Sequence, residues 1–342
     1  MKPVKPAMHA VRIRQVVAWI SFLVMTCWGT MAIVFSNLST VLRIGVATTF
    51  GIAALVSVML PQRNGGKLIC FSSVFAVVLA WWLVLPPSNF RDWQPDVATL
   101  PCATVTGSVV TLHKIRNCDY RTENDYIVRH YDKTFDLGSL RSMDLFLVDW
   151  GLPHMAHTML SFGFGNDEYV CFSIETRKKK GEEYSSIRGF FKQYELTYVV
   201  ADERDVVRLR ANYRKGEDVY LYRLNATPEL IRMVFMDYLR SVNKLNEQPE
   251  WYNALTANCT TDIWKHIVAY YPKATFDWRI LASGHAAEKA YELGTIDQTS
   301  SFQELKRLSL INERSKAADR VPAYSRAIRA GLPGFESGRR AP

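Results

Sequence analysis

The feature that most constrains this chain is its first 87 residues, which contain no Asp or Glu. Three apolar runs without an internal charge lie there: Val16–Phe35, Ile44–Leu60 and Leu68–Leu85. Each is close to the ~20 residues that a helix needs to cross a bilayer. A cleaved signal peptide would explain only the first run. We therefore expect three transmembrane helices in residues 1–87; the second run, which is short and contains two glycines, also fits a re-entrant segment.

The basic residues of this segment predict its orientation. Four precede the first run, two separate the second from the third, and one lies in the remaining loop: Lys2, Lys5, Arg12, Arg14; Arg63, Lys67; Arg43. Because basic loops stay in the cytoplasm, three spans place everything after Pro87 on the opposite side. We expect a bacterial inner-membrane protein with a periplasmic domain, and Trp81, Trp82 and Trp93 near the exit boundary.

The net charge of +9 follows from this topology. Residues 88–342 hold all 33 acidic residues and 35 of the 42 basic ones, so they are almost neutral. The charge therefore gives no reason to expect a nucleic-acid partner.

The remaining residues predict an α+β domain over 88–315 and a C-terminal tail over 316–342 that frays. Period-two patterns predict strands, and a capped pattern predicts a helix at Pro228–Leu245 with Thr227 as N-cap. The expected strands are Val105–His113, Asp144–Asp149, Thr158–Phe164, Tyr169–Thr176, Tyr194–Ala201 and Asp218–Leu224.

The strongest local pattern is a hairpin with the loop Gly165-Asn-Asp167. Its even-numbered residues are apolar and its odd-numbered ones include His157, Ser161, Ser173 and Glu175. A three-residue loop pairs residues whose numbers sum to 332, which sets Glu175 opposite His157. Cross-strand Cβ atoms lie ~5 Å apart, so the carboxylate can orient the imidazole.

A second pattern predicts a helix that starts at Asn258 and places Cys259 in its first turn. The free amide groups and dipole of a helix start favour the thiolate, the nucleophilic form of cysteine. With His157 as base and Glu175 as orienting acid, Cys259 completes the set of groups for thiol acyl transfer. Asn258 is a supporting candidate.

Structural interpretations compete with this one. A single cysteine is commonly a small buried apolar residue, and a His–Glu pair on a hairpin is commonly a surface pair. His154 is an alternative base in a loop, and His266 fits a packed helix residue. Zinc binding by His and Cys lacks four well-spaced ligands, so we expect neither a metal nor a cofactor.

Two charged clusters have simple interpretations as well. Arg177–Lys180 fits a solvated loop or a contact with anionic lipid headgroups, with Arg177 beside the site. Asp202–Asp205 fits a charged turn. Of the cysteines beyond the spans, Cys102 and Cys118 are the natural disulfide pair, which leaves Cys171 and Cys259 reduced.

The blocks from AHTMLSFGF to VVRLR, then VYLYRL and PEWYNALTANCTTDIW, resemble the Lnb N-terminal periplasmic domain family over about residues 105–275. The resemblance implies a circularly permuted papain-like (NlpC-type) fold, similar to lecithin:retinol acyltransferase-like enzymes. It also implies Cys259 as nucleophile and His157 as base, whereas Glu175 rests mainly on the hairpin register.

These observations favour a membrane-anchored thiol acyltransferase. It would move an acyl chain from a phospholipid through a Cys259 thioester to an amine, such as a lipoprotein N-terminus. Two alternatives stay open: a cysteine amidase or peptidase acting on cell-wall peptide, and a non-catalytic envelope scaffold.

Overall fold

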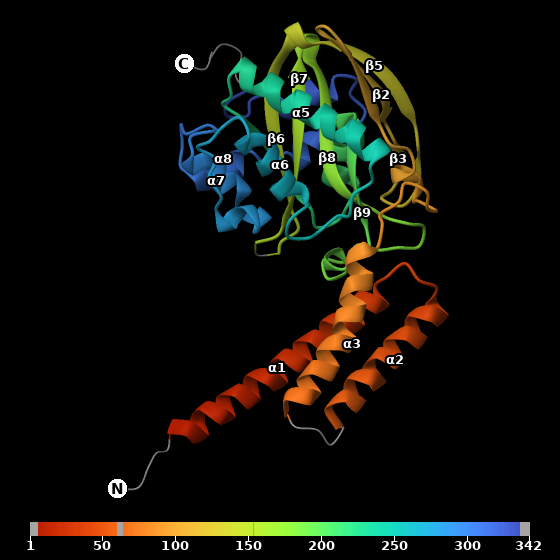
Figure 1. Cartoon of the computed structure of the whole chain (residues 1–342). Coiled ribbons are helices and arrows are strands. Elements are labelled where there is room, and N and C mark those ends of the chain that lie inside the picture. The colour runs from red at the N-terminus through yellow and green to blue at the C-terminus, as the bar shows by residue number, and fades with distance from the viewer. Residues whose placement is uncertain (1–5, 60–63, 153, 336–342) are drawn as a thin grey trace. The chain divides into compact units, whose positions relative to one another are not determined.

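The computed structural model describes residues 6–59, 64–152 and 154–335, and the chain divides into two compact units. An anchor unit consists of residues 1–87 together with Ser185–Gln193, and a sheet domain consists of Ser88–Tyr184 and Tyr194–Pro342. Figure 1 shows the three long helices of the anchor unit and the helices and strands of the sheet domain.

The anchor unit contains three antiparallel helices: α1 (Pro6–Val34), α2 (Thr40–Met59) and α3 (Asn64–Val84). Segments Ile13–Val34, Thr40–Met59 and Gly66–Val84 are long and apolar enough to cross a membrane. The second segment is one continuous helix of 20 residues and not a re-entrant segment. Helices α1 and α2 approach closely at Gly29, where a Cβ atom would lie 2.7 Å from the Phe50 ring. Small residues permit such close packing between membrane helices.

The loop Ser185–Gln193 packs against these helices although it comes from the middle of the chain. The Phe191 ring lies 6.0 Å from Trp28 and 5.7 Å from Phe35, measured between ring centroids. The ammonium group of Lys192 donates to the backbone oxygens of Trp82 and Leu83, at 2.9 and 3.0 Å. These bonds satisfy carbonyl groups at the end of α3, which has no further helical turn to supply donors.

The sheet domain is built on an eight-stranded, mostly antiparallel sheet of order β1-β2-β9-β8-β7-β6-β10, with β5 paired to β2. Its strands are β1 (Cys102–Thr106), β2 (Val109–Arg116), β5 (His130–Asp136), β6 (Leu140–Asp149), β7 (Ala156–Phe164), β8 (Glu168–Arg177), β9 (Glu195–Ala201) and β10 (Asp218–Arg223). The short strands β3 (Asp119–Tyr120) and β4 (Tyr126–Ile127) form a separate ribbon.

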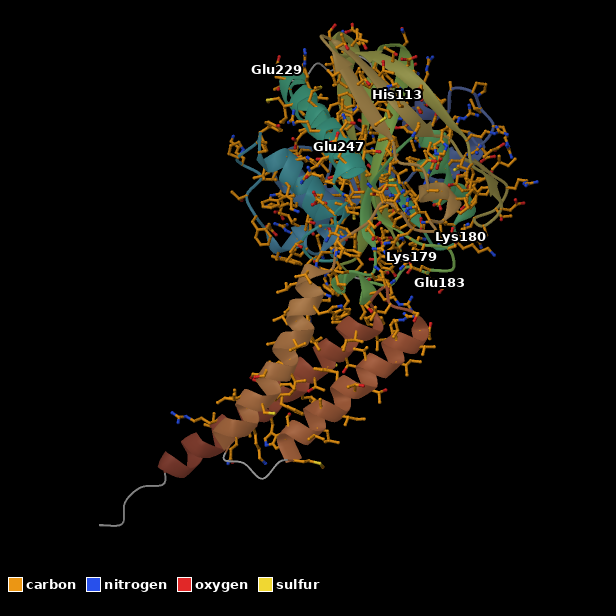
Figure 2. All side chains as sticks on the ribbon, turned by 45° about the vertical axis from the view of Figure 1, so that its right-hand side comes forward. His113, Lys179, Lys180, Glu183, Glu229 and Glu247 are labelled. Carbon is orange, nitrogen blue, oxygen red and sulfur yellow. The ribbon has the colours of Figure 1, made fainter. Side chains whose placement is uncertain are left out.

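Helices cover both faces of the sheet. They are α4 (Glu203–Arg208), α5 (Pro228–Glu247), α6 (Cys259–Val268), α7 (Ala286–Glu292), α8 (Phe302–Leu308), α9 (Asn312–Ala317) and α10 (Tyr324–Arg329). Helix α5 begins as predicted, with the Thr227 hydroxyl accepting from the Leu230 amide and Pro228 in the first turn. Glu229 and Glu247 mark its two ends in Figure 2.

The β7–β8 hairpin has the predicted register. Leu160 pairs with Phe172 and Phe164 with Glu168, so that paired numbers sum to 332. The even-numbered apolar face packs under α5 and α6, with Phe162 5.0 Å from Phe235 between ring centroids. The α+β class is confirmed by this arrangement.

Two local predictions were wrong. The expected strand Val105–His113 is a hairpin, because Gly107 adopts a left-handed φ of +61° and turns the chain between β1 and β2. Residues Asp202–Asp205 form the N-cap and first turn of α4 instead of the expected charged turn, and Glu203 and Asp205 are fully buried. Trp93, expected near the membrane boundary, packs against the Arg177 guanidinium, and its position relative to a membrane stays a prediction.

The C-terminal residues do not fray in the described part, which ends at residue 335. Tyr324, Ile328 and Leu332 pack on the odd-numbered face of β7 and β8 around Met159 and Cys171. Arg329 enters the same layer and pairs with two fully buried carboxylates, Glu203 and Asp144. The Arg- and Gly-rich composition of this segment suggested a frayed tail. It could not show that Arg329 pairs with buried acidic residues elsewhere in the chain.

Candidate active site

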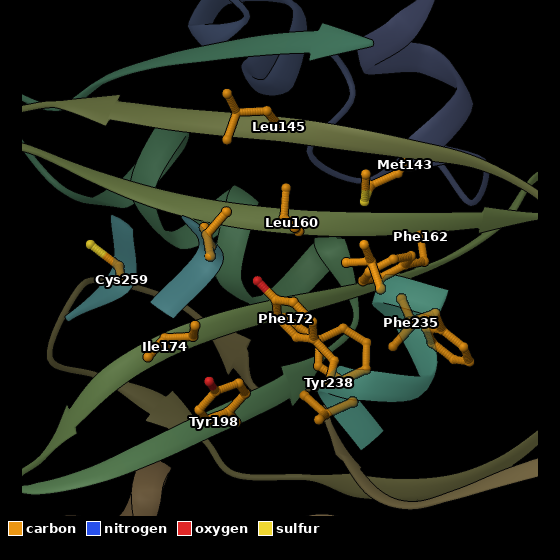
Figure 3. Packing of buried hydrophobic residues seen from close by; sticks show 14 of the residues in the cluster. Met143, Leu145, Leu160, Phe162, Phe172, Ile174, Tyr198, Phe235, Tyr238 and Cys259 are labelled. Carbon is orange, nitrogen blue, oxygen red and sulfur yellow. The ribbon is translucent and has the colours of Figure 1, made fainter. Parts of the chain in front are cut away.

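The structure brings the three predicted catalytic residues together at one end of the main apolar cluster. His157 lies on β7, Glu175 on the adjacent strand β8, and Cys259 at the first position of α6. Figure 3 shows Cys259 beyond Ile174, at the end of the cluster opposite Phe235. His157 and Cys259 are both buried, with 6% and 8% of their surface exposed.

Ser173 joins His157 to Glu175 in a chain of hydrogen bonds. The Ser173 Oγ lies 2.7 Å from His157 Nε2 and 2.6 Å from Glu175 Oε1. A carboxylate only accepts, so the Ser173 hydroxyl donates to Glu175 and must accept from an N–H at Nε2. The neutral imidazole therefore has its lone pair on Nδ1, the nitrogen left to act as base toward Cys259.

Arg210 holds the carboxylate from the other side. Its Nη2 donates to Glu175 Oε1 at 2.6 Å, and Oε1 also lies 3.2 Å from His157 Nε2. Arg210 belongs to the π-helical turn Leu209–Tyr213, which follows α4. A guanidinium, a hydroxyl and an imidazole thus converge on one oxygen, which fixes the position of Glu175.

The start of α6 positions the sulfur. Asn258 caps the helix, its side-chain oxygen accepting from the amides of Thr260 and Thr261 at 3.0 and 2.9 Å. The sulfur lies 3.8 Å from the Thr260 hydroxyl oxygen, and His157 and Thr158 are near enough to lower its pKa. Since Asn258 occupies the next two amides, the Cys259 amide is the N–H at this helix start that no described residue engages.

The electrostatics favour a thiolate–imidazolium pair. Burial alone would raise the pKa of Cys259, but the charge and hydrogen bond of His157, with donors from Thr158, lower it to about 7. Burial would lower the pKa of His157, but Glu175 and Cys259 raise it to about 9. The pKa of Glu175 is held well below its usual range by His157 and Arg210, against the effect of burial. Between pH about 7 and pH about 9 the Cys259 sulfur is therefore ionised and the His157 ring is protonated.

The three supporting candidates have different places. Asn258 adjoins Cys259 and acts as the cap. His154 is exposed and bonds through Nδ1 to Nε2 of His285, at 2.6 Å, so it contacts another loop instead of the sulfur.

Arg177 is buried and structural. It donates to the backbone oxygens of Val97 and Ala98 and to Asn89, and burial lowers its pKa to about 10. The expectation of a solvated or lipid-facing Arg177 was wrong, because its side chain points into the segment that precedes β1. Lys180, labelled in Figure 2, pairs with Asp92 at 2.7 Å.

Sequence reasoning missed Ser173 and Arg210 as parts of the site. Ser173 was available from the register, because it lies on the same face as Glu175, two positions earlier. Arg210 comes from a separate element with no motif. His266 is packed as expected, between the Tyr198 hydroxyl at 2.8 Å and Asp237 at 2.5 Å.

The cysteines are unpaired in the structure, including Cys102 and Cys118. Cys118 is buried, and burial followed by the Asp205 charge raises its thiol pKa to about 12. The expected Cys102–Cys118 bridge is thus not formed. Among residues 6–59, 64–152 and 154–335, no group of three or more His, Cys, Asp or Glu side chains is placed to hold a metal ion.

Fold and site together define a membrane-anchored α+β protein in which a buried cysteine and histidine adjoin a half-buried carboxylate. Residues 128–284, which include all three of these side chains, match the family model of the Lnb N-terminal periplasmic domain. The family and the three apolar helices indicate a membrane-anchored protein with a periplasmic domain. Comparison with curated proteins and with solved structures gave no match.

Proposed function

We propose that the protein is a thiol acyltransferase of the bacterial inner membrane. It takes an acyl chain from a phospholipid, holds it as a thioester on Cys259, and passes it to an amine such as a lipoprotein N-terminus. The observation that carries the proposal is the buried pair Cys259–His157 with the hydrogen-bonded chain from His157 through Ser173 to Glu175; the pKa of the Cys259 thiol is lowered to about 7. We regard the domain as a circularly permuted papain-like fold, since the His157 strand precedes the Cys259 helix.

In the first half-reaction the Cys259 thiolate attacks the carbonyl carbon of a lipid ester. The tetrahedral intermediate collapses, the carbon–oxygen bond breaks, and protonated His157 gives its Nδ1 proton to the departing alcohol. The products are a Cys259 thioester and a lysophospholipid. In the second half-reaction the amine attacks the thioester, neutral His157 takes the amine proton, and the thiolate leaves. Both halves are balanced without a cofactor.

The negatively charged oxygen of the tetrahedral intermediate needs a hydrogen-bond donor to stabilise it. The Cys259 amide, at the start of α6, is the group we assign to this task, because Asn258 already engages the amides of Thr260 and Thr261. The positive end of the helix dipole acts in the same direction.

The surroundings of the sulfur favour lipid over cell-wall peptide. Cys259 lies at the end of an apolar cluster that includes Ile174, Leu160 and Ile263. A peptidase working on a polar, crosslinked wall needs an open polar cleft, whereas an ester carbonyl flanked by acyl chains suits apolar walls. A membrane anchor also raises the local concentration of a lipid donor.

The test uses the full chain in vesicles that contain phospholipid with a labelled acyl chain, plus a lipopeptide with a free N-terminus. Wild type is expected to form lysophospholipid and a mass adduct on the Cys259 peptide. Cys259→Ser is expected to lose both, and Cys102→Ser, the matched control on β1, to keep both. Release of cell-wall peptide fragments without lysophospholipid would establish the peptidase instead. Equal behaviour of wild type and Cys259→Ser in every assay would leave only the scaffold.

A further inference from the structure

A cavity of about 150 Å³ lies in the sheet domain beside the candidate site. It is bounded by β6 and β7 on the sheet side and by α6 and α7 on the helix side. Its walls are mainly apolar and include Leu160, Ile263, Ile267 and Ala290. An apolar cavity of this size holds small apolar ligands in other proteins and does not retain water well.

The cavity lies next to the sulfur. Thr158 and Thr260 both line it, and each directly follows a catalytic residue in the chain. Their hydroxyl oxygens are 3.1 Å apart, and the Thr260 Oγ1 lies 3.8 Å from Cys259 Sγ. One pair of threonine side chains therefore separates the nucleophile from the cavity.

The charged residues at the cavity are already neutralised. Arg279 pairs with Asp277 and Glu292, and Lys289 pairs with Asp277. An anionic headgroup or a peptide carboxylate would have to displace these partners. The cavity thus offers apolar surface and hydroxyls but no unpaired charge, which fits a hydrocarbon chain.

We propose that this cavity receives part of the acyl chain that Cys259 carries as a thioester. The inference rests on the proposed function and adds a substrate property to it: the enzyme selects substrates by the length of the acyl chain. Each methylene buried in the cavity strengthens binding about fourfold. The preference for longer chains therefore rises until the cavity is full and then levels off.

The first experiment measures how fast p-nitrophenyl esters of two, four, six and eight carbons acylate Cys259 in the full chain. In wild type the rate is expected to rise with chain length up to a plateau. Ala290→Phe fills the cavity and is expected to remove that rise while leaving the two-carbon ester within about twofold of wild type. Ala317→Phe, on the exposed side of α9, is the matched control and keeps the wild-type profile.

A second variant tests the inference independently, in case the Ala290→Phe protein does not fold. Ile267→Ala enlarges the cavity and is expected to move the plateau to longer chains, the opposite direction. If both variants are folded and show the wild-type chain-length profile, the cavity does not hold the chain and the inference is wrong.

Labelling without catalysis separates this inference from the proposed function. A diazirine-bearing decanoate is added to Cys259→Ala protein in vesicles, illuminated, and the crosslinked peptides are identified. Crosslinks to α6 and α7 that disappear in Cys259→Ala/Ala290→Phe support the cavity even if no thioester ever forms in wild type. A wild-type thioester without such crosslinks would support the function and overturn the cavity.

Discussion

At the residue scale, the site holds a thiolate–imidazolium pair, two opposite charges on the buried side chains of Cys259 and His157. The Cys259 thiol loses its proton at about 7, and the His157 ring at about 9. Ser173 and Arg210 both donate hydrogen bonds to Glu175 and keep its carboxylate ionised beside His157. The negative charge of Glu175 in turn keeps the His157 ring protonated.

The pair predicts two different pH profiles. Alkylation of Cys259 by iodoacetamide needs only the thiolate, so its rate should rise through pH about 7 and then stay level. Lysophospholipid formation also needs protonated His157, so it should fall again above pH about 9. Mass spectrometry of the Cys259 peptide and lipid analysis measure the two rates. Alkylation that rises only near pH 8.5, as for an isolated cysteine, would contradict the pairing.

Glu175→Gln tests the source of the raised histidine pKa. Without the carboxylate charge the pKa of His157 should fall, so the alkaline limb of lysophospholipid formation moves to lower pH and the maximum rate drops. Glu217→Gln is the matched control, because Glu217 also faces Arg210, at 3.7 Å, and no described contact joins it to His157. Identical alkaline limbs in wild type and Glu175→Gln would show that another group sets this pKa.

Much of this site could be predicted from the sequence because its parts obey local rules. A three-residue loop fixes a hairpin register, and a polar cap fixes a helix start, so His157, Glu175 and Cys259 could be placed from short stretches. Arg210 and the burial of Arg177 could not. Both depend on contacts with residues far away in the chain, and a basic residue in a sequence carries no sign of whether it is buried.

At the scale of elements, the last helix of the described chain is held by charge as well as by apolar packing. Arg329 of α10 donates to Glu203 at 2.6 and 2.7 Å and to Asp144 at 2.9 Å, and all three side chains are buried. The two acids come from α4 and β6. The cluster therefore ties the C-terminal segment to the face of the sheet behind the site.

Arg329→Met should destabilise the domain strongly. It removes the Arg329 cation from buried Glu203 and leaves Asp144 paired with Arg223 alone, and removing one partner of a buried ion pair costs about 3–5 kcal/mol. Arg326→Met on the same helix is the control, because Arg326 is exposed and lies 3.8 Å from Asp167, and it should cost less than about 1 kcal/mol. Thermal unfolding of the full chain in detergent measures both. Equal unfolding temperatures for the two variants would contradict the structural role of the cluster.

At the scale of the whole molecule, the chain passes between its two units three times, at Pro87, at Tyr184 and at Gln193. The second and third passages exist because the loop Ser185–Gln193 leaves the sheet domain and packs on the anchor helices. Tyr184 ends the sheet-domain segment before the loop, and its ring stacks with that of Tyr194, which starts the next segment, at 6.3 Å between centroids. The loop is thus continuous with the sheet domain at both of its ends.

A protein that begins at Ser88 should associate or precipitate, although its sheet domain keeps its own core. It would expose Phe191, now buried, in addition to Ile187 and Phe190, which are already exposed. Replacing 185–193 in that shortened protein with a Gly/Ser linker should restore a monomer, measured by size-exclusion chromatography with light scattering. A monomeric Ser88–Pro342 protein that keeps the natural loop would contradict this expectation.

The same loop bears on how such proteins can be assembled by recombination. A gene fusion at Pro87 that joined the sheet domain to other membrane helices would bring Phe191 and Lys192 without the Trp28, Phe35 and Trp82 groups that receive them. A functional exchange would have to carry both partners or reshape nine residues at the same time. We therefore expect this domain and its anchor to be inherited together, and sequence changes in the loop to be matched by changes at the ends of α1 and α3.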